Sequence, residues 1–442
     1  MPCCQWTART RSYGLRKPPH ELAEDRYRTV NERAMMESLL IAALPYELAA
    51  GRQSEADNIV SGAIEDWIKT GLKFGQTSNG ERLFDPVEVF NHMKWTGVTG
   101  RDGFWSSHFI PTARSFTQQS AGMNGGCLKP LAEKRFSVEL RRKFDFQNSS
   151  SNRKLRLRLP LPLASHARDI QVKPISPDGA GVSISQSNGR LEFQAIMNEP
   201  GSLEVGGALD FTTNGTQQSN NAETLGGEER ELYLRPSEGL IRITPRIAEL
   251  AAAFSDAGNP LEVALKAWNF LLDELSCGMV RYDQVDTQAP GDWVLDNGWY
   301  DCQLGSSVFI AICRACGIPA RLASGYMLYE LAPGYHYWSE IWQDGAGWLP
   351  FDLLCWDLSA GGRDTHWRTH FAGVIDYRMV TQCFPLSFTG PMTVRFPAAW
   401  HLLNAPIPDG MEIRFTALDG APIYSDRVVS SRASVDRMSD AI

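Results

Sequence analysis

One segment constrains the fold of this chain more than any other. It begins at Cys302, continues as an apolar stripe at helical spacing, and stops at Gly317-Ile318-Pro319, where a glycine and a following proline typically end a helix. Three strand patterns follow directly, at residues 320–329, 335–343 and 347–352. A helix followed by neighbouring antiparallel strands predicts an α+β fold class for this part of the chain.

Two further helices are expected ahead of this segment. Thr244 followed by Pro245, and Asn259 followed by Pro260, each place a capping side chain before a proline at the first helical position. We therefore predict an α+β core over residues 236–360.

The rest of the chain changes pattern several times. In residues 134–211 apolar and polar side chains alternate in short runs, as in Leu155, Leu157 and Leu159, which predicts an antiparallel β-sandwich. The remaining regions are interpreted as a disordered leader (1–20), a helical N-terminal domain (21–130), a polar linker (212–235) and a β-rich C-terminal extension (361–442).

Composition excludes several classes of protein. The 442 residues correspond to about three domains, and the formal net charge of −8 disfavours a nucleic-acid coat. The longest apolar run, residues 39–44, is far shorter than the roughly 20 residues of a membrane span. Without an export signal, we expect a cytoplasmic protein with no nucleic-acid or membrane partner.

The nine cysteines are an odd number, so at least one thiol is free or pairs between chains. Cys313 and Cys316 form a CxxC pair, but both lie in the apolar helix pattern and are interpreted as buried thiols. His366 and His370 have a spacing that suits zinc, but the segment lacks the glutamate of an HExxH motif and is interpreted as a surface or packing feature. No acidic loop has the spacing of a calcium EF-hand, so the sequence predicts no metal site and no cofactor.

The predicted core contains a cysteine, a histidine and an aspartate, the three residue types that act together in nucleophilic catalysis. Cys302 begins a helix, where free N–H groups and the helix dipole favour a thiolate. His336 lies on the second strand and Asp352 ends the third. We expect the cysteine to attack, the histidine to move the proton, and the aspartate to orient the histidine.

The surrounding sequence resembles the transglutaminase-like superfamily. The resemblance rests on DCQLGSSVFIAICRACGIPARLASGY, YHYWSEIW and GWLPFD, which occur in the family's order. It implies a papain-like core in which a helix-borne cysteine packs on an antiparallel sheet, and it aligns Cys302, His336 and Asp352 with the family's catalytic types. Many members carry glycine two positions before the cysteine, where this chain has Tyr300.

The resemblance implies acyl transfer or hydrolysis at a carboxamide, peptide or thioester carbonyl through a Cys302 thioester. Partners would be a peptide, protein or small amide or thioester, with an amine as possible acceptor. We expect Trp299, Tyr300 and Trp338 to contact substrate, the first two by narrowing the entrance. An amide-forming biosynthetic enzyme and a non-catalytic interaction module remain alternatives. The sequence leaves the acyl donor, the acceptor and the oligomeric state open.

Overall fold

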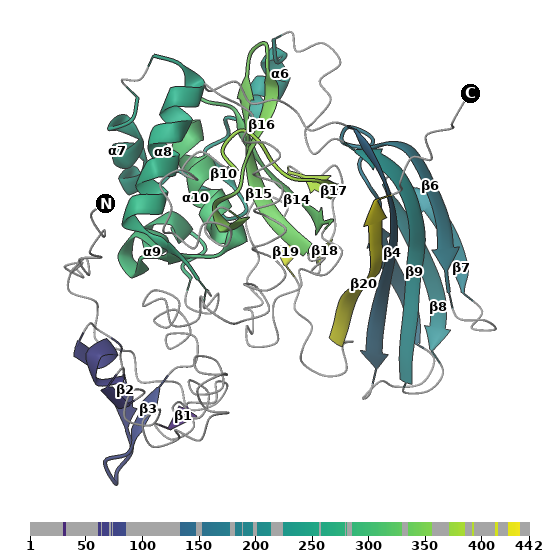
Figure 1. Cartoon of the computed structure of the whole chain (residues 1–442), viewed down its shortest axis with the longest axis horizontal. Coiled ribbons are helices and arrows are strands. Elements are labelled where there is room, and N and C mark those ends of the chain that lie inside the picture. The colour runs from purple at the N-terminus through teal and green to yellow at the C-terminus, as the bar shows by residue number, and fades with distance from the viewer. Residues whose placement is uncertain are drawn as a thin grey trace, which may run out of the picture.

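The computed structural model describes the chain in separate stretches (Figure 1). These are residues 30–31, 61–84, 133–213, 224–328, 335–355, 371–384, 391–392, 412–413 and 423–433, with short gaps inside the longer ranges. Helices and a four-stranded sheet form the core, and two further sheets form a separate module beside it. The predicted leader, residues 1–20, lies outside the described residues.

Two core helices begin where the sequence supplies caps. α7 (Pro245–Ala252) follows Thr244, and α8 (Pro260–Glu274) follows Asn259; each cap side chain accepts a backbone N–H from the first turn. These contacts satisfy N–H groups that the helix itself leaves without acceptors. Both helix starts agree with the sequence prediction.

The central helix, α10 (Cys302–Ala315), also begins and ends as predicted. The Asp301 carboxylate accepts the Leu304 N–H at 2.8 Å and caps the first turn. Gly317 follows the helix with φ of +76°, a conformation that costs glycine little. Most side chains of α10 are buried, and the helix packs on β15 (Tyr335–Gln343) and against its neighbouring helices.

The core sheet has the order β16-β15-β14-β17 and is antiparallel throughout. Its other strands are β14 (Ala320–Met327), β16 (Gly347–Phe351) and β17 (Arg378–Cys383). The first three strands in the chain match the predicted ones. β17 lies beyond residue 360, where the predicted core ends.

The two faces of β15 have different neighbours. Tyr337 and Ile341 belong to the hydrophobic cluster that α10 enters. Trp338 belongs to another cluster, with Ala323 and Val380. The sheet is therefore covered on both faces, by helices on one and by other segments on the face that carries Trp338.

The predicted linker contains a helix. α6 (Gly227–Leu232) lies inside residues 212–235, and Leu225 and Tyr233 beside it are buried with Trp342 and Trp348. These apolar residues near the end of a polar stretch anchor it to the core, which the composition alone did not reveal. α9 (Pro290–Asn297) was also not predicted; it begins without a side-chain cap.

Two facing sheets make up the module beside the core. One has the order β20-β4-β9-β6 and the other β5-β8-β7, and they enclose one apolar cluster that includes Leu140, Phe193 and Phe211. The bounds are β4 (Lys134–Phe146), β5 (Arg153–Pro160), β6 (Arg168–Ile175), β7 (Ser183–Ser187), β8 (Arg190–Met197), β9 (Gly201–Thr213) and β20 (Ile423–Ala433). We call these strands the two-sheet module. Strands β4 to β8 lie where the alternation predicts strands.

The C-terminal strand β20 joins this module by pairing with β4, from Ile423 opposite Asp145 to Ala433 opposite Phe136. The sequence predicts a β-rich C-terminal extension over residues 361–442 but does not predict the strand with which β20 pairs. The module is thus built from two segments that the core separates in the sequence.

The described part of residues 21–130 is not purely helical. Positions 61–62 and 64–69 are helical, but β1 (Val30–Asn31), β2 (Phe74–Gln76) and β3 (Arg82–Phe84) form an antiparallel sheet of order β1-β3-β2. The rest of the predicted helical N-terminal domain lies outside the described residues.

Short strand pairs complete the described structure: β10 (Ser237–Glu238) with β11 (Ile241–Arg242), β12 (Ser276–Cys277) with β13 (Trp299–Tyr300), and β18 (Pro391–Met392) with β19 (Glu412–Ile413). Within the described residues, none of the helices has the length and apolar character required to span a membrane.

Candidate active site

Cys302 is the first residue of α10 and is partly exposed, whereas Asp301 before it is buried. This end of the helix lies beside β15, because the Tyr337 backbone N–H donates a hydrogen bond to the Cys302 sulfur. β16 ends at Phe351, opposite Ser339, so it does not pair with β15 at Tyr337. The early end of β16 therefore leaves room for the cysteine at the edge of β15.

The electrostatic setting of Cys302 differs from the expected one. Burial and the negative charge of Asp301 raise the pKa of the Cys302 thiol well above its ordinary value, while the Tyr337 N–H lowers it. The helix start had led us to expect a lowered pKa. The residue that caps the helix is itself an anion, and burial disfavours the thiolate. The resting sulfur is therefore a neutral thiol.

His336 and Asp352 form a buried pair. The His336 Nε2 lies 2.7 Å from Asp352 Oδ2, and both side chains are almost fully buried. Asp352 Oδ1 accepts the Cys355 backbone N–H at 2.9 Å. Burial works to raise the pKa of Asp352, but His336 and Arg378 outweigh it and hold that pKa well below its usual range. Asp352 is therefore a carboxylate at neutral pH.

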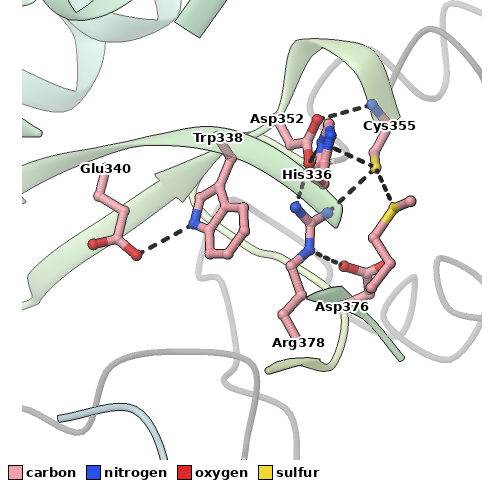
Figure 2. A network of polar contacts seen from close by, with 8 residues as sticks. His336, Trp338, Glu340, Asp352, Cys355, Asp376 and Arg378 are labelled. Carbon is pink, nitrogen blue, oxygen red and sulfur yellow. Dashed lines mark hydrogen bonds and ion pairs between the residues drawn. The ribbon is translucent and has the colours of Figure 1, made fainter. Parts of the chain in front are cut away.

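Arg378, at the start of β17, extends this pair into a network (Figure 2). Its Nη1 lies 2.6 Å from Asp352 Oδ2, its Nε donates to Asp376 at 2.7 Å, and its guanidinium lies over the Trp338 ring at 4.8 Å. The buried guanidinium neutralises the Asp352 carboxylate and fixes its orientation. Arg378 stands in no local sequence pattern that would identify it, because its partner Asp352 comes from another part of the chain.

A second thiol, Cys355, also lies beside His336. Its Sγ is 3.8 Å from His336 Nε2 and accepts from Arg378 Nη2 at 3.3 Å. Cys355 is fully buried, and burial with the Asp352 charge raises its pKa well above the ordinary value. Cys355 was not singled out from the sequence either.

The ligand atoms of His336, Asp352 and Cys355 lie within 4.8 Å of one another, which is close enough for a shared metal ion. Arg378, however, contacts both Cys355 Sγ and the same Asp352 oxygen that faces His336. A cation already occupies the position from which a metal would bind, so this cluster favours proton chemistry over metal binding.

The structure thus joins two of the three predicted catalytic residues directly and places the third nearby. His336 and Asp352 are hydrogen-bonded, whereas among the described residues no hydrogen bond joins His336 to Cys302. Asp352 engages Nε2, so Nδ1 is the ring nitrogen left for a proton from the Cys302 thiol.

The three residues expected to contact substrate are buried. Tyr300 is 1 % exposed, Trp338 1 % and Trp299 5 %. The Tyr300 ring lies against Gly305 of α10, where a side chain on that glycine would overlap it. Tyr300 therefore packs against α10, and the Trp338 ring packs against the Arg378 guanidinium.

Residues 248–353 match the family profile of the transglutaminase-like superfamily. This range holds α10, the three strands predicted from the sequence, and the His336–Asp352 pair. The chain contains a transglutaminase-like core.

A curated relative agrees with this assignment over part of the chain. A protein-glutamine gamma-glutamyltransferase of Pseudomonas aeruginosa is 28 % identical over 124 residues, which are 26 % of this chain and 18 % of the relative. This chain therefore spans less than a fifth of the relative it matches.

Two solved structures are similar to parts of the chain at low sequence identity. A candidate cysteine protease from Cytophaga hutchinsonii covers 69 % of this chain and 91 % of its own length, with 13 % identity and a TM-score of 0.41. The periplasmic domain of TgpA from Pseudomonas aeruginosa covers 55 % of this chain and 93 % of its own, with 16 % identity and a TM-score of 0.31.

Proposed function

We propose that this chain is a cysteine-dependent acyltransferase or hydrolase that acts on a carboxamide, peptide or thioester carbonyl. The observation that carries the proposal is the buried His336–Asp352 pair, 2.7 Å apart, on the strands beside the helix that begins with Cys302. The transglutaminase-like core supports the same chemistry but leaves the reaction open, because one scaffold can host several activities.

The first step transfers a proton from the Cys302 thiol to His336 Nδ1 as the sulfur attacks the carbonyl carbon. Because the thiol is neutral at rest, this transfer accompanies attack and no preformed thiolate is needed. Asp352 stabilises the imidazolium that forms, and Arg378 keeps the carboxylate ionised.

The tetrahedral oxyanion needs hydrogen-bond donors at the same end of the helix. The backbone N–H of Cys302 lies in the first turn of α10, where N–H groups lack helical acceptors, so we assign it as one donor. The imidazolium then protonates the leaving amine or thiol, and the Cys302 thioester remains.

The acceptor decides between two versions of the reaction. Water gives an amidase or peptidase, and a primary amine gives an amide-forming or cross-linking enzyme. The name of the Pseudomonas aeruginosa relative, a gamma-glutamyltransferase, favours testing amines first. A non-catalytic module with the same fold is the alternative from another class, and the buried charge network around His336 speaks against it.

The test offers the enzyme a glutamine-containing peptide and a peptide thioester, each with and without a primary amine. Ammonia or thiol release measures acylation, and amine incorporation measures transfer. Cys302→Ala should reduce release by at least about 10³-fold, and Cys316→Ala, which removes a partly buried thiol from the other end of α10, should leave it unchanged.

Release that persists in Cys302→Ala would contradict the proposed nucleophile. No release from any donor by a folded wild-type chain would favour the interaction module.

A further inference from the structure

A cluster of three ligand-type side chains lies outside the candidate active site, at the contact between the two-sheet module and the core. His166 comes from the turn between β5 and β6, Glu340 from β15, and Cys383 from the end of β17. Their ligand atoms all lie within 4.8 Å of one another. The residues are more than 40 positions apart in the sequence, so they form no sequence motif with the spacing of a metal site.

The nitrogen of His166 that faces this cluster is buried and unsatisfied. Its Nε2 makes no hydrogen bond, and the side chain is 4 % exposed. The same nitrogen lies 3.5 Å from Glu340 Oε1. A buried polar atom without a hydrogen bond is costly, so a ligand at this point would remove a penalty.

The other polar atoms of His166 and Glu340 already have partners that orient them. His166 Nδ1 lies 2.9 Å from the Ser165 hydroxyl. Glu340 Oε2 accepts from Arg321 Nε and Nη2 at 2.8 Å each, which leaves Oε1 facing His166 with only the Trp338 indole N–H nearby, at 3.3 Å. Metal-binding histidines and carboxylates are typically held in this way by partners on their remaining atoms.

Figure 2 shows Trp338 between Glu340 and Arg378, with its indole nitrogen toward Glu340 and its ring beside Arg378. Each cluster has an arginine guanidinium near its carboxylate, but the two arginines contact different carboxylate oxygens. Arg378 contacts the Asp352 oxygen that faces His336, whereas Arg321 contacts the Glu340 oxygen that points away from His166. The Glu340 oxygen that faces His166 is therefore not the one that Arg321 contacts, although Arg321 also acts electrostatically on Cys383.

The turn that carries His166 is fixed to the core sheet. The Leu163 backbone N–H donates to the Val380 carbonyl of β17 at 2.8 Å, and the Thr213 hydroxyl donates to the His166 carbonyl at 2.9 Å. These bonds hold the imidazole in place before any ligand arrives, which reduces the entropy cost of binding.

We propose that His166, Glu340 and Cys383 form a zinc site that joins the two-sheet module to the core. A nitrogen, a carboxylate oxygen and a sulfur are the donor set that Zn²⁺ takes in tetrahedral sites, with a fourth position left for water. Two ligands at the usual zinc bond lengths lie roughly 3.4 Å apart in a tetrahedron, close to the 3.5 Å between His166 Nε2 and Glu340 Oε1.

Binding displaces the thiol proton of Cys383 to solvent as the zinc–sulfur bond forms. Glu340 Oε2 is already paired with Arg321, so the carboxylate binds as an anion and releases no proton.

The test adds Zn²⁺ or Co²⁺ to the full chain after removal of metal with a chelator and dialysis. We expect the chain to bind one equivalent of zinc, which raises its unfolding temperature. With cobalt, we expect a complex that shows the charge-transfer band of a thiolate ligand. His166→Gln and Cys383→Ser should each weaken zinc binding by at least about tenfold. Removing a residue that hydrogen-bonds to a metal ligand typically costs at least this much affinity, and removing the ligand itself should cost no less. Cys383→Ser should abolish the cobalt band.

Cys355→Ser and Cys316→Ser are the matched controls, and both should bind as the wild type does. Near-ultraviolet circular dichroism confirms that each variant is folded. A wild-type chain that binds no zinc would overturn the proposal and leave a plain His166–Glu340 contact. A cobalt band that survives in Cys383→Ser, or disappears in Cys355→Ser, would overturn it as well.

Discussion

At the scale of single residues, the structure changes the expected chemistry of the nucleophile. A helix start suggests a lowered thiol pKa, but the carboxylate of Asp301 and burial raise the pKa of Cys302. The sulfur therefore depends on His336 for deprotonation, and Asp352 with Arg378 determines how well the histidine can accept the proton.

Asp301→Asn tests this electrostatic account. Asparagine keeps a side-chain oxygen that can accept the Leu304 N–H, so the helix cap remains, but the negative charge beside the thiol is removed. The pKa of Cys302 should fall, and its alkylation by iodoacetamide at pH 8 should become about three to ten times faster. Peptide mapping by mass spectrometry follows the rate, with Cys316 in the same sample as the unchanged reference. An equal or slower rate at Cys302 would refute the role given to Asp301.

Asp352→Asn tests the buried network through stability. Removing a charged partner from a buried pair costs about 3–5 kcal/mol of unfolding free energy at pH 7. The pKa of Asp352 is lowered in the folded state, so its stabilisation is complete above the unfolded value near 4 and is lost as the pH falls. Urea unfolding at pH 7, 5, 4 and 3 should show the gap between wild type and variant shrinking toward acid. A gap that is constant or widens would be inconsistent with a depressed pKa.

Residues of the site differ in how far the sequence alone could identify them. Cys302, His336 and Asp352 stand in recognisable local patterns, a helix start and two strands. Arg378, Cys355 and His166 do not, because their partners belong to other elements and the contacts exist only after the sheet and the module have assembled.

At the scale of elements, the core sheet depends on a close approach between β14 and β17. A Cβ on Gly325 would overlap the Met379 carbonyl oxygen, and the pairing register shifts between Ser324 and Gly325. The backbone of β17, which carries Arg378, can reach β14 only because this position lacks a side chain.

Gly325→Ala should therefore lower the unfolding free energy by about 1–3 kcal/mol or more, the usual cost of forcing extra volume into a packed site. Urea denaturation measures the change. Gly227→Ala at the start of α6 is the control, because nothing lies near its added methyl group, and it should be neutral or slightly stabilising. Equal stability of the Gly325→Ala variant and wild type would show that the strands tolerate a wider spacing.

Side-chain N-caps made two core helices predictable from the sequence. Other elements were not predicted, because they lack a side-chain cap or an alternation of apolar and polar residues. Thr244 and Asn259 mark the starts of α7 and α8, whereas α9 follows Ala289 and has no side-chain cap. β17 is buried along most of its length, so it shows no alternation that would predict a strand. α6 was missed because its own residues are mostly charged and its anchors lie beside it.

At the scale of the whole molecule, the last described strand of the chain pairs with a strand from a much earlier segment. β20 pairs with β4, although the entire transglutaminase-like core lies between them in the sequence. Pairing at such separation leaves no local signal, which is why the sequence predicts a β-rich C-terminal extension but not its partner strand.

Deleting residues 423–442 should expose one edge of β4. Backbone amides of β4 that point toward β20 should then exchange with deuterium faster, while those that point toward β9 should keep their protection. Hydrogen exchange with fragment analysis resolves the two sets. Uniform protection across β4 in the shortened chain would contradict the pairing, and rapid exchange of β9 as well would show that the module unfolds.

The central claim is that Cys302 carries the acyl group, and mapping a trapped acyl-enzyme tests it most directly. The chain is mixed with an acyl donor, quenched in acid within the turnover time, digested and sequenced by mass spectrometry. We predict a thioester on Cys302 that is absent from Cys302→Ala and accumulates less in His336→Gln. An acyl group found on Cys355, or on no cysteine while product is formed, would contradict the claim.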